Sequence, residues 1–259
     1  MSTKPSIKVC GSGEDIVLLH GWAMHSGVWV DMAKQLAQSH RVTLLDLPGF
    51  GDSDLVFGGY ELEDIAQQIF AIIPAKAIWM GWSMGGLIAM WIAIHHPEAV
   101  KKLILVSSSP CFIEKPNWPG INPGVFDQFD VSLKKDVQHA ILRFLNLQLG
   151  ENQYVARQKH LRQLKALMFA KKLPTIDALI GGLDLLRNID MRPQLFAIKC
   201  PVLFILGEVD RLVPASIDET LNAYIPQALI GVIPQAAHVP FFSHAQIFLE
   251  MVKRFLHAK

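Results

Sequence analysis

The sequence predicts an α/β fold in which helices flank a mostly parallel central sheet and a helical lid is inserted into that core. Apolar, strand-like runs alternate with helical periods up to residue 109, the alternation stops over residues 110–198, and it resumes from residue 199. Alternation of this kind is typical of parallel strands joined by helical crossovers. We therefore expect a core formed by residues 1–109 and 199–259 and a lid formed by residues 110–198.

The first part of the core alternates expected strands with expected helices. Short apolar runs predict strands at residues 15–20, 41–49, 77–81 and 101–108. Helical periodicity predicts helices at residues 28–38, 62–73 and 86–96, the last of them ending before Pro97. Residues 77–94 carry no charge, but Gly and Ser interrupt this run. A buried strand followed by a buried helix therefore explains it better than a membrane span.

The lid region shows helical periods and no strand candidate. Residues 118–124 have the Pro and Gly content of a loop, and helical segments are expected at residues 131–149, 152–173 and 175–189. Strand-like runs return at residues 201–210 and 228–234, and a final helix is expected at residues 243–259. The chain shows no internal repeat, which agrees with a single sheet carrying one helical insertion.

Composition, net charge and cysteine spacing limit the classes to which this protein can belong. With 51% hydrophobic and 18% charged residues, a chain of 259 residues can bury a large core, and its net charge of +1 gives no global attraction to nucleic acid or membrane. Cys10, Cys111 and Cys200 lie far apart without metal-ligand spacing, and the N-terminus has no apolar segment of signal-peptide type. We expect a cytoplasmic, monomeric protein that binds no nucleic acid or membrane.

The stretch MGWSMGG, residues 80–86, places one serine between two glycine positions. Gly81 and Gly85 flank Ser83 in a complete G-x-S-x-G motif, after a strand-like run and before a helical one. A tight strand-to-helix turn can force positive φ on the serine and leaves no room for Cβ atoms two positions to either side. The motif predicts that Ser83 is a nucleophile exposed at the carboxyl edge of the sheet. A chance pentapeptide in a buried turn is the alternative.

A serine hydroxyl needs a base to take its proton and an acid to orient that base. Among ten histidines, His238 is favoured because it lies in a loop directly after a late strand. The acid is expected between the serine and the histidine in chain order, at another strand end. Asp210 meets this condition, Glu208 is a nearby rival within the turn, and a turn or helix-cap role is the structural alternative for Asp210.

Attack on an acyl carbon creates an oxyanion that two backbone N–H groups can stabilise. One donor is expected to be the N–H of Met84, next to the nucleophile. The second is expected in LLHGWAM, where Gly21 permits a close approach and the N–H of Trp22 can point inward. His20 in the same stretch is expected to hydrogen-bond the loop. The reaction needs no metal and no organic cofactor.

Five motifs along the chain together resemble the α/β-hydrolase superfamily. They are HGW, DLPGFGDS, GWSMGG, GEVD and AAHVPF, and they occur in the order of that superfamily over essentially the whole chain. Within it, the segments SSPCF, WPGI, RFLNLQ and IGGLDLL are similar to the methyl ester carboxylesterases of biotin synthesis. This resemblance implies hydrolysis of a methyl ester through an acyl-enzyme, with the far end of the acyl chain attached to a small acidic acyl carrier protein.

The resemblance also implies which residues contact the substrate. Helical spacing alone would place the RFLNLQL segment in the core. The implied substrate-binding residues are Trp22, Ser83, Met84, Phe144, Leu145, Asn146, Leu147, Gln148 and His238. Trp82 would add to the apolar acyl channel.

A basic segment offers a docking surface for an acidic carrier. Residues 134–172 hold nine Lys or Arg and two acids, a net charge of +7, while the rest of the chain carries −6. Such a field steers an acidic partner, although a solvated helix face is the plainer interpretation. Arg143 and Arg157 match arginines of the family's lid, Arg162 matches with a shift of one residue, and His139 replaces an arginine.

Two other functions stay open at this point. A generalist short-chain esterase or a carbon–carbon bond hydrolase would use the same three residues. A ligand receptor on a hydrolase fold would not need them intact. Dehalogenases and epoxide hydrolases are disfavoured, because they need a carboxylate at the position of Ser83.

Overall fold

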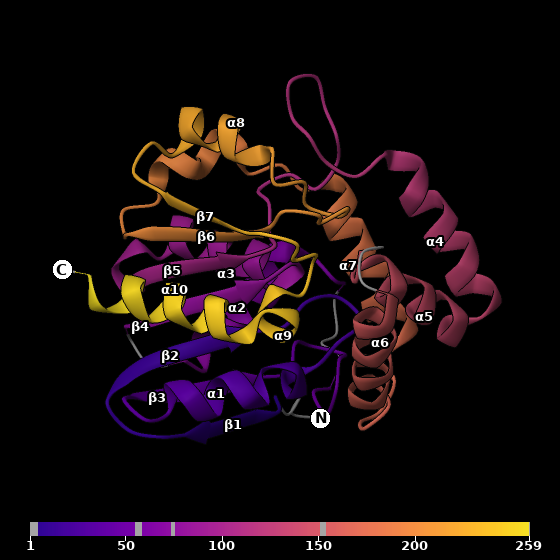
Figure 1. Cartoon of the computed structure of the whole chain (residues 1–259), viewed down its shortest axis with the longest axis horizontal. Helices are drawn as coiled ribbons and strands as arrows, with labels where there is room; N and C mark the ends of the chain where they lie inside the picture. The colour runs from indigo at the N-terminus through magenta and orange to yellow at the C-terminus, as the bar shows by residue number, and fades with distance from the viewer. Residues whose placement is uncertain (1–4, 55–58, 74–75, 151–153, 259) are drawn as a thin grey trace.

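The computed structural model describes residues 5–54, 59–73, 76–150 and 154–258 and shows one sheet with helices on both faces and a helical lid at one end (Figure 1). The strand order is β1-β3-β2-β4-β5-β6-β7. Among the strand pairs of the described residues, β1 and β3 are antiparallel and the other pairs are parallel. The strands are Ile7–Cys10 (β1), Glu14–Leu19 (β2), His40–Leu45 (β3), Ala77–Trp82 (β4), Val100–Val106 (β5), Val202–Gly207 (β6) and Leu229–Ile233 (β7).

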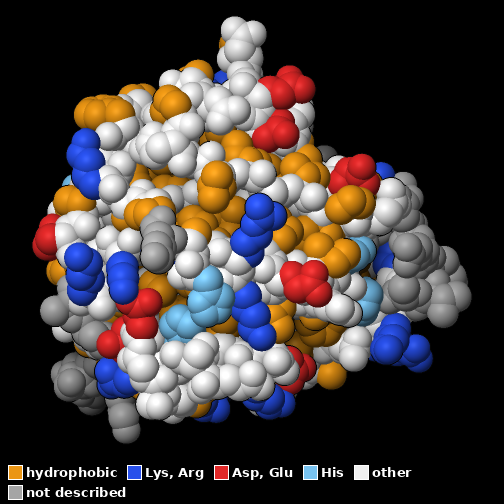
Figure 2. All heavy atoms as spheres, turned by 60° about the vertical axis from the view of Figure 1, so that its left-hand side comes forward, with side chains coloured by type: hydrophobic (Ala, Val, Ile, Leu, Met, Phe, Trp, Pro, Cys, Tyr) orange, Lys and Arg blue, Asp and Glu red, His pale blue; other side chains and the backbone are white. Residues whose placement is uncertain are grey.

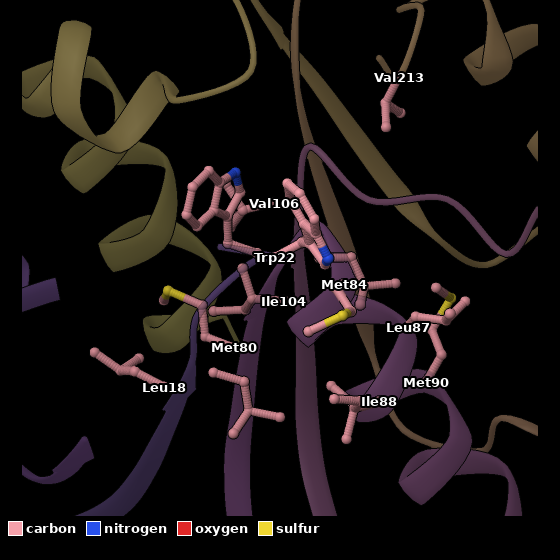
Figure 3. Packing of buried hydrophobic residues seen from close by; sticks show 14 of the residues in the cluster. Leu18, Trp22, Met80, Met84, Leu87, Ile88, Met90, Ile104, Val106 and Val213 are labelled. Atoms are coloured by element: carbon pink, nitrogen blue, oxygen red, sulfur yellow. The ribbon is translucent and has the colours of Figure 1, made fainter. Parts of the chain in front are cut away.

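The core helices cover both faces of the sheet. In Figure 1, α1 and α10 lie in front of the sheet and α2 and α3 lie behind it. The helices are Val30–Leu36 (α1), Leu62–Ala71 (α2), Met84–His95 (α3), Ile217–Tyr224 (α8), Pro240–Ser243 (α9) and Ala245–His257 (α10). Figure 3 shows Leu87 and Ile88 of α3 on one side of the strands, and Met80 of β4 and Ile104 of β5 on the other side. A Cβ on Gly81 of β4 would lie 2.3 Å from the carbonyl oxygen of Gly85 in α3, so the start of α3, and therefore Ser83, packs closely against the sheet.

In the described part of residues 110–198, four α-helices form the lid beyond the carboxyl edge of the sheet, at the right of Figure 1. They are Pro123–Lys135 (α4), Val137–Leu147 (α5), Tyr154–Met168 (α6) and Ile176–Asn188 (α7). This agrees with the expected helical insertion. The central parallel strands β2 to β6 also lie within or close to the predicted runs.

Several predicted boundaries were wrong. One helix was expected over residues 131–149, but Asp136 adopts an extended φ of −157°, and its side chain accepts the N–H of His139 at 3.0 Å, so α4 ends and α5 begins there. The loop expected over residues 118–124 ends early, because Asn122 caps α4 and Pro123 occupies its first position. The exposed strand β1 and the helix α8 were not predicted.

No helix among the described residues is both long and apolar enough to cross a membrane. The uncharged run over residues 77–94 instead forms β4 and most of α3, as expected. Both elements are buried almost throughout, because strands and helices of the core surround them. On the face shown in Figure 2, Lys and Arg side chains are interspersed with Asp and Glu, so neither sign of charge dominates there.

Candidate active site

Ser83 lies in a strained turn between β4 and α3. Its φ of 53° and ψ of −121° place a residue with a side chain in a backbone region that favours glycine. A Cβ on Gly81 would collide with the backbone of Gly85, and a Cβ on Gly85 would lie 2.5 Å from the carbonyl oxygen of His20. The predicted turn geometry is therefore confirmed, and both glycines are needed for it.

The predicted exposure of Ser83 was wrong. Only 2% of the residue is exposed, because the lid covers the carboxyl edge of the sheet where Ser83 lies. The backbone around it is held on two sides. The Ser83 N–H donates to the carbonyl of Val106 at 2.9 Å, and the hydroxyl of Ser108 donates to the Ser83 carbonyl at 2.8 Å. The serine thus occupies a rigid and shielded position.

The structure brings Ser83, His238 and Asp210 into one hydrogen-bonded relay. His238 Nε2 lies 2.9 Å from Ser83 Oγ, and His238 Nδ1 lies 2.8 Å from Asp210 Oδ2. An ionised carboxylate can only accept, so Nδ1 carries the hydrogen and Nε2 presents its lone pair to the serine hydroxyl. This arrangement can remove the serine proton during attack on an acyl carbon.

Asp210 is fixed by two backbone donors. Its Oδ1 accepts the N–H of Leu212 at 2.8 Å and of Val213 at 3.1 Å, which leaves Oδ2 for His238. The rival Glu208 is exposed, and its carboxylate instead accepts the backbone N–H of Gln235 at 2.9 Å. The sequence favoured Asp210 over Glu208, and the structure places Asp210, not Glu208, against the histidine.

His238 is held through its backbone as well as its ring. Its N–H donates to the carbonyl of Gln148 at 3.0 Å, and the indole Nε1 of Trp82 donates to its carbonyl at 2.8 Å. The histidine itself has no exposed surface. Both bonds fix the backbone from which the ring extends to Asp210 and Ser83, and the first joins the lid to the core.

The expected oxyanion donors lie on the two segments that meet at Ser83. A Cβ on Gly21 would lie 3.1 Å from Ser83 Cβ, so glycine allows this close approach. Among the described residues, neither the N–H of Trp22 nor that of Met84 has a hydrogen-bond acceptor. The Trp22 side chain is fixed by its Nε1–H, which donates to the carbonyl of Leu179 in the lid at 2.8 Å. Two backbone donors are therefore unused beside the nucleophile.

His20 has the structural role that the sequence predicted. Its Nδ1 donates to the carbonyl of Gly21 at 2.8 Å, and its Nε2 accepts the N–H of Leu47 at 2.9 Å. Complete burial lowers the pKa of His20 to about 4, against the opposing effects of Asp46 and the bond to Gly21. The ring is neutral at pH 7 and connects two loops.

A narrow apolar cavity opens beside Ser83. Of the predicted substrate contacts, Phe144 lines it, and Trp22 packs edge-on against Phe144 with ring centroids 4.7 Å apart. The other lining residues come mostly from the lid and were missed from the sequence, where their spacing is ordinary core spacing. They are Phe112, Ile121, Val125, Phe126, Phe129, Leu183, Leu186 and Leu212.

The rest of the predicted substrate segment does not line this cavity. Leu145 is fully buried, Leu147 is partly buried, and Asn146 bonds the carbonyl of Leu142 at 3.0 Å. The buried side-chain amide of Gln148 has no hydrogen-bond partner among the described residues, although Gln148 neighbours His238. An unpartnered amide at this place can bind a polar group of a substrate.

The three arginines expected at the docking surface do not share one face. Arg143 on α5 bonds Gln128 and lies over the ring of Phe129 at 5.4 Å. Arg157 on α6 points toward α5, where it lies 3.5 Å from Asn146 Oδ1. Arg162 is exposed, and five residues along a helix separate it from Arg157 by about 140°. Arg143 and Arg157 thus form one side, and Arg162 faces another direction.

No group of three or more His, Cys, Asp or Glu residues within the described part of the chain is placed to hold a metal ion.

A serine, histidine and aspartate in this geometry, at the carboxyl edge of a mostly parallel sheet, define a serine hydrolase site. The chain belongs to the α/β hydrolase fold family, whose model matches residues 16–245.

Relatives of known name cover nearly the whole chain. The chain is 44% identical over 249 residues to the pimeloyl-[acyl-carrier protein] methyl ester esterase of Yersinia enterocolitica, covering 95% of each chain. It is 43% identical over 250 residues to the enzyme of the same name from Pectobacterium carotovorum, covering 96% of each chain. Among solved structures, an esterase from Exiguobacterium antarcticum is 24% identical with a TM-score of 0.89, over 99% of this chain and 96% of its own. At that identity it supports the fold alone.

Proposed function

We propose that this protein is a serine carboxylesterase that hydrolyses the methyl ester of pimeloyl-[acyl-carrier protein]. The products are methanol and pimeloyl-[acyl-carrier protein], and the latter is used in biotin synthesis. The observation that carries this proposal is an intact relay of Ser83, His238 and Asp210 in a chain more than 40% identical to esterases of that name. A receptor on a hydrolase fold would have no need for three aligned catalytic groups.

The first half of the reaction forms an acyl-enzyme. Ser83 Oγ attacks the ester carbonyl carbon while its proton passes to His238 Nε2, and the N–H groups of Trp22 and Met84 stabilise the oxyanion. Asp210 keeps the proton on Nδ1 and stabilises the imidazolium. The tetrahedral intermediate then collapses, the bond to the methoxy oxygen breaks, and His238 gives that oxygen its proton to release methanol.

The second half returns the enzyme to its resting state. His238 takes a proton from water, the resulting hydroxide adds to the acyl carbon, and the Ser83–acyl bond breaks with the proton returning to Ser83. Each step uses groups of this chain and one water molecule. The acyl chain is released as a carboxylic acid, still joined to its carrier at the other end.

The basic lid supports a carrier-bound substrate. We propose that Arg143 and Arg157 form the side that meets the acidic carrier protein and that Arg162 contributes less, because it faces away from them. The protein would work as a monomer in the cytoplasm, with this carrier as its macromolecular partner rather than nucleic acid or membrane. The apolar residues that line the cavity beside Ser83, Phe144 among them, would hold the acyl chain together with Trp22, and the unpartnered amide of Gln148 would bind a polar group of the substrate.

Growth of a biotin-requiring bacterial strain that lacks its own methyl esterase tests the proposal. The intact chain should restore growth without biotin, and the Ser83→Ala variant should not. Purified enzyme should also show a higher kcat/KM for the carrier-bound methyl ester than for free short-chain esters. Activity on free esters combined with no complementation would instead favour the generalist esterase.

A further inference from the structure

Two aspartates of the DLPGFGDS motif lie outside the relay and hold the lid. Lys171, just after α6, donates to Asp46 Oδ2 at 2.6 Å and lies 2.8 Å from Asp52 Oδ2. The Asp46 side chain has no exposed surface, and the Lys171 side chain is 12% exposed. This is a nearly buried ion pair between the lid and the loop that follows β3. Lys171 is therefore engaged with the core, unlike the exposed lysines of the basic segment.

The pair is ionised at neutral pH. Burial works against the charged form of Asp46. The charge of His20, in the acidic range where that ring is protonated, and the hydrogen bonds from Lys171 and Ser26 hold the pKa of the carboxyl well below its ordinary value. Burial likewise works against the charge on Lys171, but hydrogen bonds to Asp46 and Asp52 raise its pKa. Each charge is stable in this position because the other is present.

A second polar contact joins the same end of the lid to the core. His25 Nδ1 accepts the N–H of Gly27 at 3.0 Å, so its hydrogen lies on Nε2, which donates to the carbonyl of Leu167 at 2.7 Å. Lys171 and His25 together fix the end of α6. Both contacts are made to the loops after β2 and β3.

Asp46 also holds the loop that carries an expected oxyanion donor. That loop spans residues 20–26 and includes Trp22. At its far end, the N–H of Ser26 donates to Asp46 Oδ1 at 2.8 Å. At its near end, Leu47, the residue after Asp46, donates its N–H to His20 Nε2, and His20 in turn bonds the carbonyl of Gly21. One carboxylate and its neighbour therefore fix both ends of the loop.

We infer that Lys171 is a positioning residue for the oxyanion hole, acting through Asp46 on the loop of residues 20–26. The inference rests on the proposed function, because it assigns the Trp22 N–H to the oxyanion. Lys171 balances the charge of Asp46, and Asp46 keeps the loop in place beside Ser83. The lid thus contributes to catalysis without touching the reacting atoms.

The expected effect follows from the sensitivity of oxyanion stabilisation to geometry. Removing Lys171 takes away the positive charge that balances buried Asp46 and leaves the carboxylate only its backbone donors, the N–H groups of Ser26 and Asp52. The carboxylate would then shift toward water and loosen the loop. A donor displaced by about 1 Å costs on the order of 100-fold in rate, and loss of one donor costs about 100- to 1,000-fold. Partial displacement of the loop should lower kcat about 10- to 100-fold.

Lys171→Met tests the inference, because methionine keeps most of the length and removes the charge. The matched control is Lys34→Met, which removes a lysine from an exposed pair with Asp31 at a similar distance of 2.8 Å. The measurements are kcat and KM with a small free methyl ester and the rate of Ser83 phosphonylation by a fluorophosphonate, whose phosphoryl oxygen occupies the same oxyanion hole. Lys171→Met should lower kcat and the phosphonylation rate by the same factor and change KM less than about threefold.

Rescue and folding controls make the result decisive. Lys171→Arg should recover most of the phosphonylation rate, and rates are normalised to the folded fraction measured by circular dichroism. If Lys171→Met does not fold, Lys171→Gln, whose amide NH2 group can still donate hydrogen bonds but carries no charge, takes its place with the same expectation. A normal phosphonylation rate in the folded variant, or a change confined to KM, would overturn the inference.

The measurements distinguish a failure of this inference from a failure of the proposed function. An enzyme that cleaves the free methyl ester with the Lys171 dependence described, but not carrier-bound pimeloyl methyl ester, would refute the substrate and leave the positioning role intact. If the enzyme cleaves the carrier-bound ester but Lys171→Met keeps full kcat, the positioning role of Lys171 is refuted and the proposed substrate stands.

Discussion

Replacing Asp210 with Asn changes one atom, and the structure determines where that change acts. Oδ1 of Asp210 accepts two backbone N–H groups, from Leu212 and Val213, whereas Oδ2 faces His238 Nδ1. The carbonyl oxygen of the new amide will keep the Oδ1 position, because an NH2 group there would oppose two donors. The NH2 group must then face His238 and donate to Nδ1. The ring hydrogen moves to Nε2, which can no longer accept the proton of Ser83.

The size of the effect can be worked from these bonds. Turning the amide over would leave two buried N–H groups unsatisfied, at a cost of about 3 kcal/mol, so on the order of 1% of molecules would hold the productive tautomer. Loss of the carboxylate charge beside the imidazolium costs about another 2 to 3 kcal/mol. Together these losses lower kcat on the order of 10⁴-fold, which is the size known for the same change in a serine protease.

Steady-state hydrolysis of a methyl ester at pH 7.5 measures this loss, and fluorophosphonate labelling measures the nucleophile directly. Glu208→Gln is the matched control, because it makes the same chemical change two residues away on a carboxylate that faces Gln235. Glu208→Gln should keep kcat within about twofold. The reasoning fails if Asp210→Asn retains more than a tenth of the wild-type kcat, or if Glu208→Gln loses as much.

Three further predictions concern the nucleophile, the lid and pH. Ser83→Ala should lower kcat by about 10⁴- to 10⁶-fold while the melting temperature stays near the wild-type value, and wild-type turnover would exclude a serine mechanism. Arg143→Glu with Arg157→Glu should lower kcat/KM for the carrier-bound ester at least about tenfold, with 0.5 M salt reproducing much of that loss and free esters unaffected; equal losses on both substrates would indicate an unfolded lid. His20 is neutral when folded, with a pKa of about 4, but takes up a proton near pH 6.5 when unfolded, so acid favours the unfolded chain. The free energy of unfolding by urea should therefore fall by about 3 kcal/mol from His20 alone between pH 7 and pH 4, and a His20→Asn variant that shows the same decline would contradict this.

The sequence by itself determined the features that depend on local backbone geometry. Only glycine fits at Gly81 and Gly85, so the turn that strains Ser83 could be predicted from five residues. The order of the central strands β2 to β6 could also be predicted, because periodicity is a local property, whereas strand β1 and helix α8 were missed. Helix ends were harder, since Asp136 and Asn122 act as caps only once the neighbouring backbone turns.

The tertiary structure decided whatever depends on contacts between distant residues. Ser83 and His238 are 155 positions apart, and Lys171 and Asp46 are 125 apart. Charge patterning grouped Lys171 with the docking surface, but packing placed it against a buried carboxylate. Ser83 was expected to be exposed, and the lid buries it. Such contacts are set by how whole elements pack, because a charged or polar side chain can be buried only where another element supplies its partner.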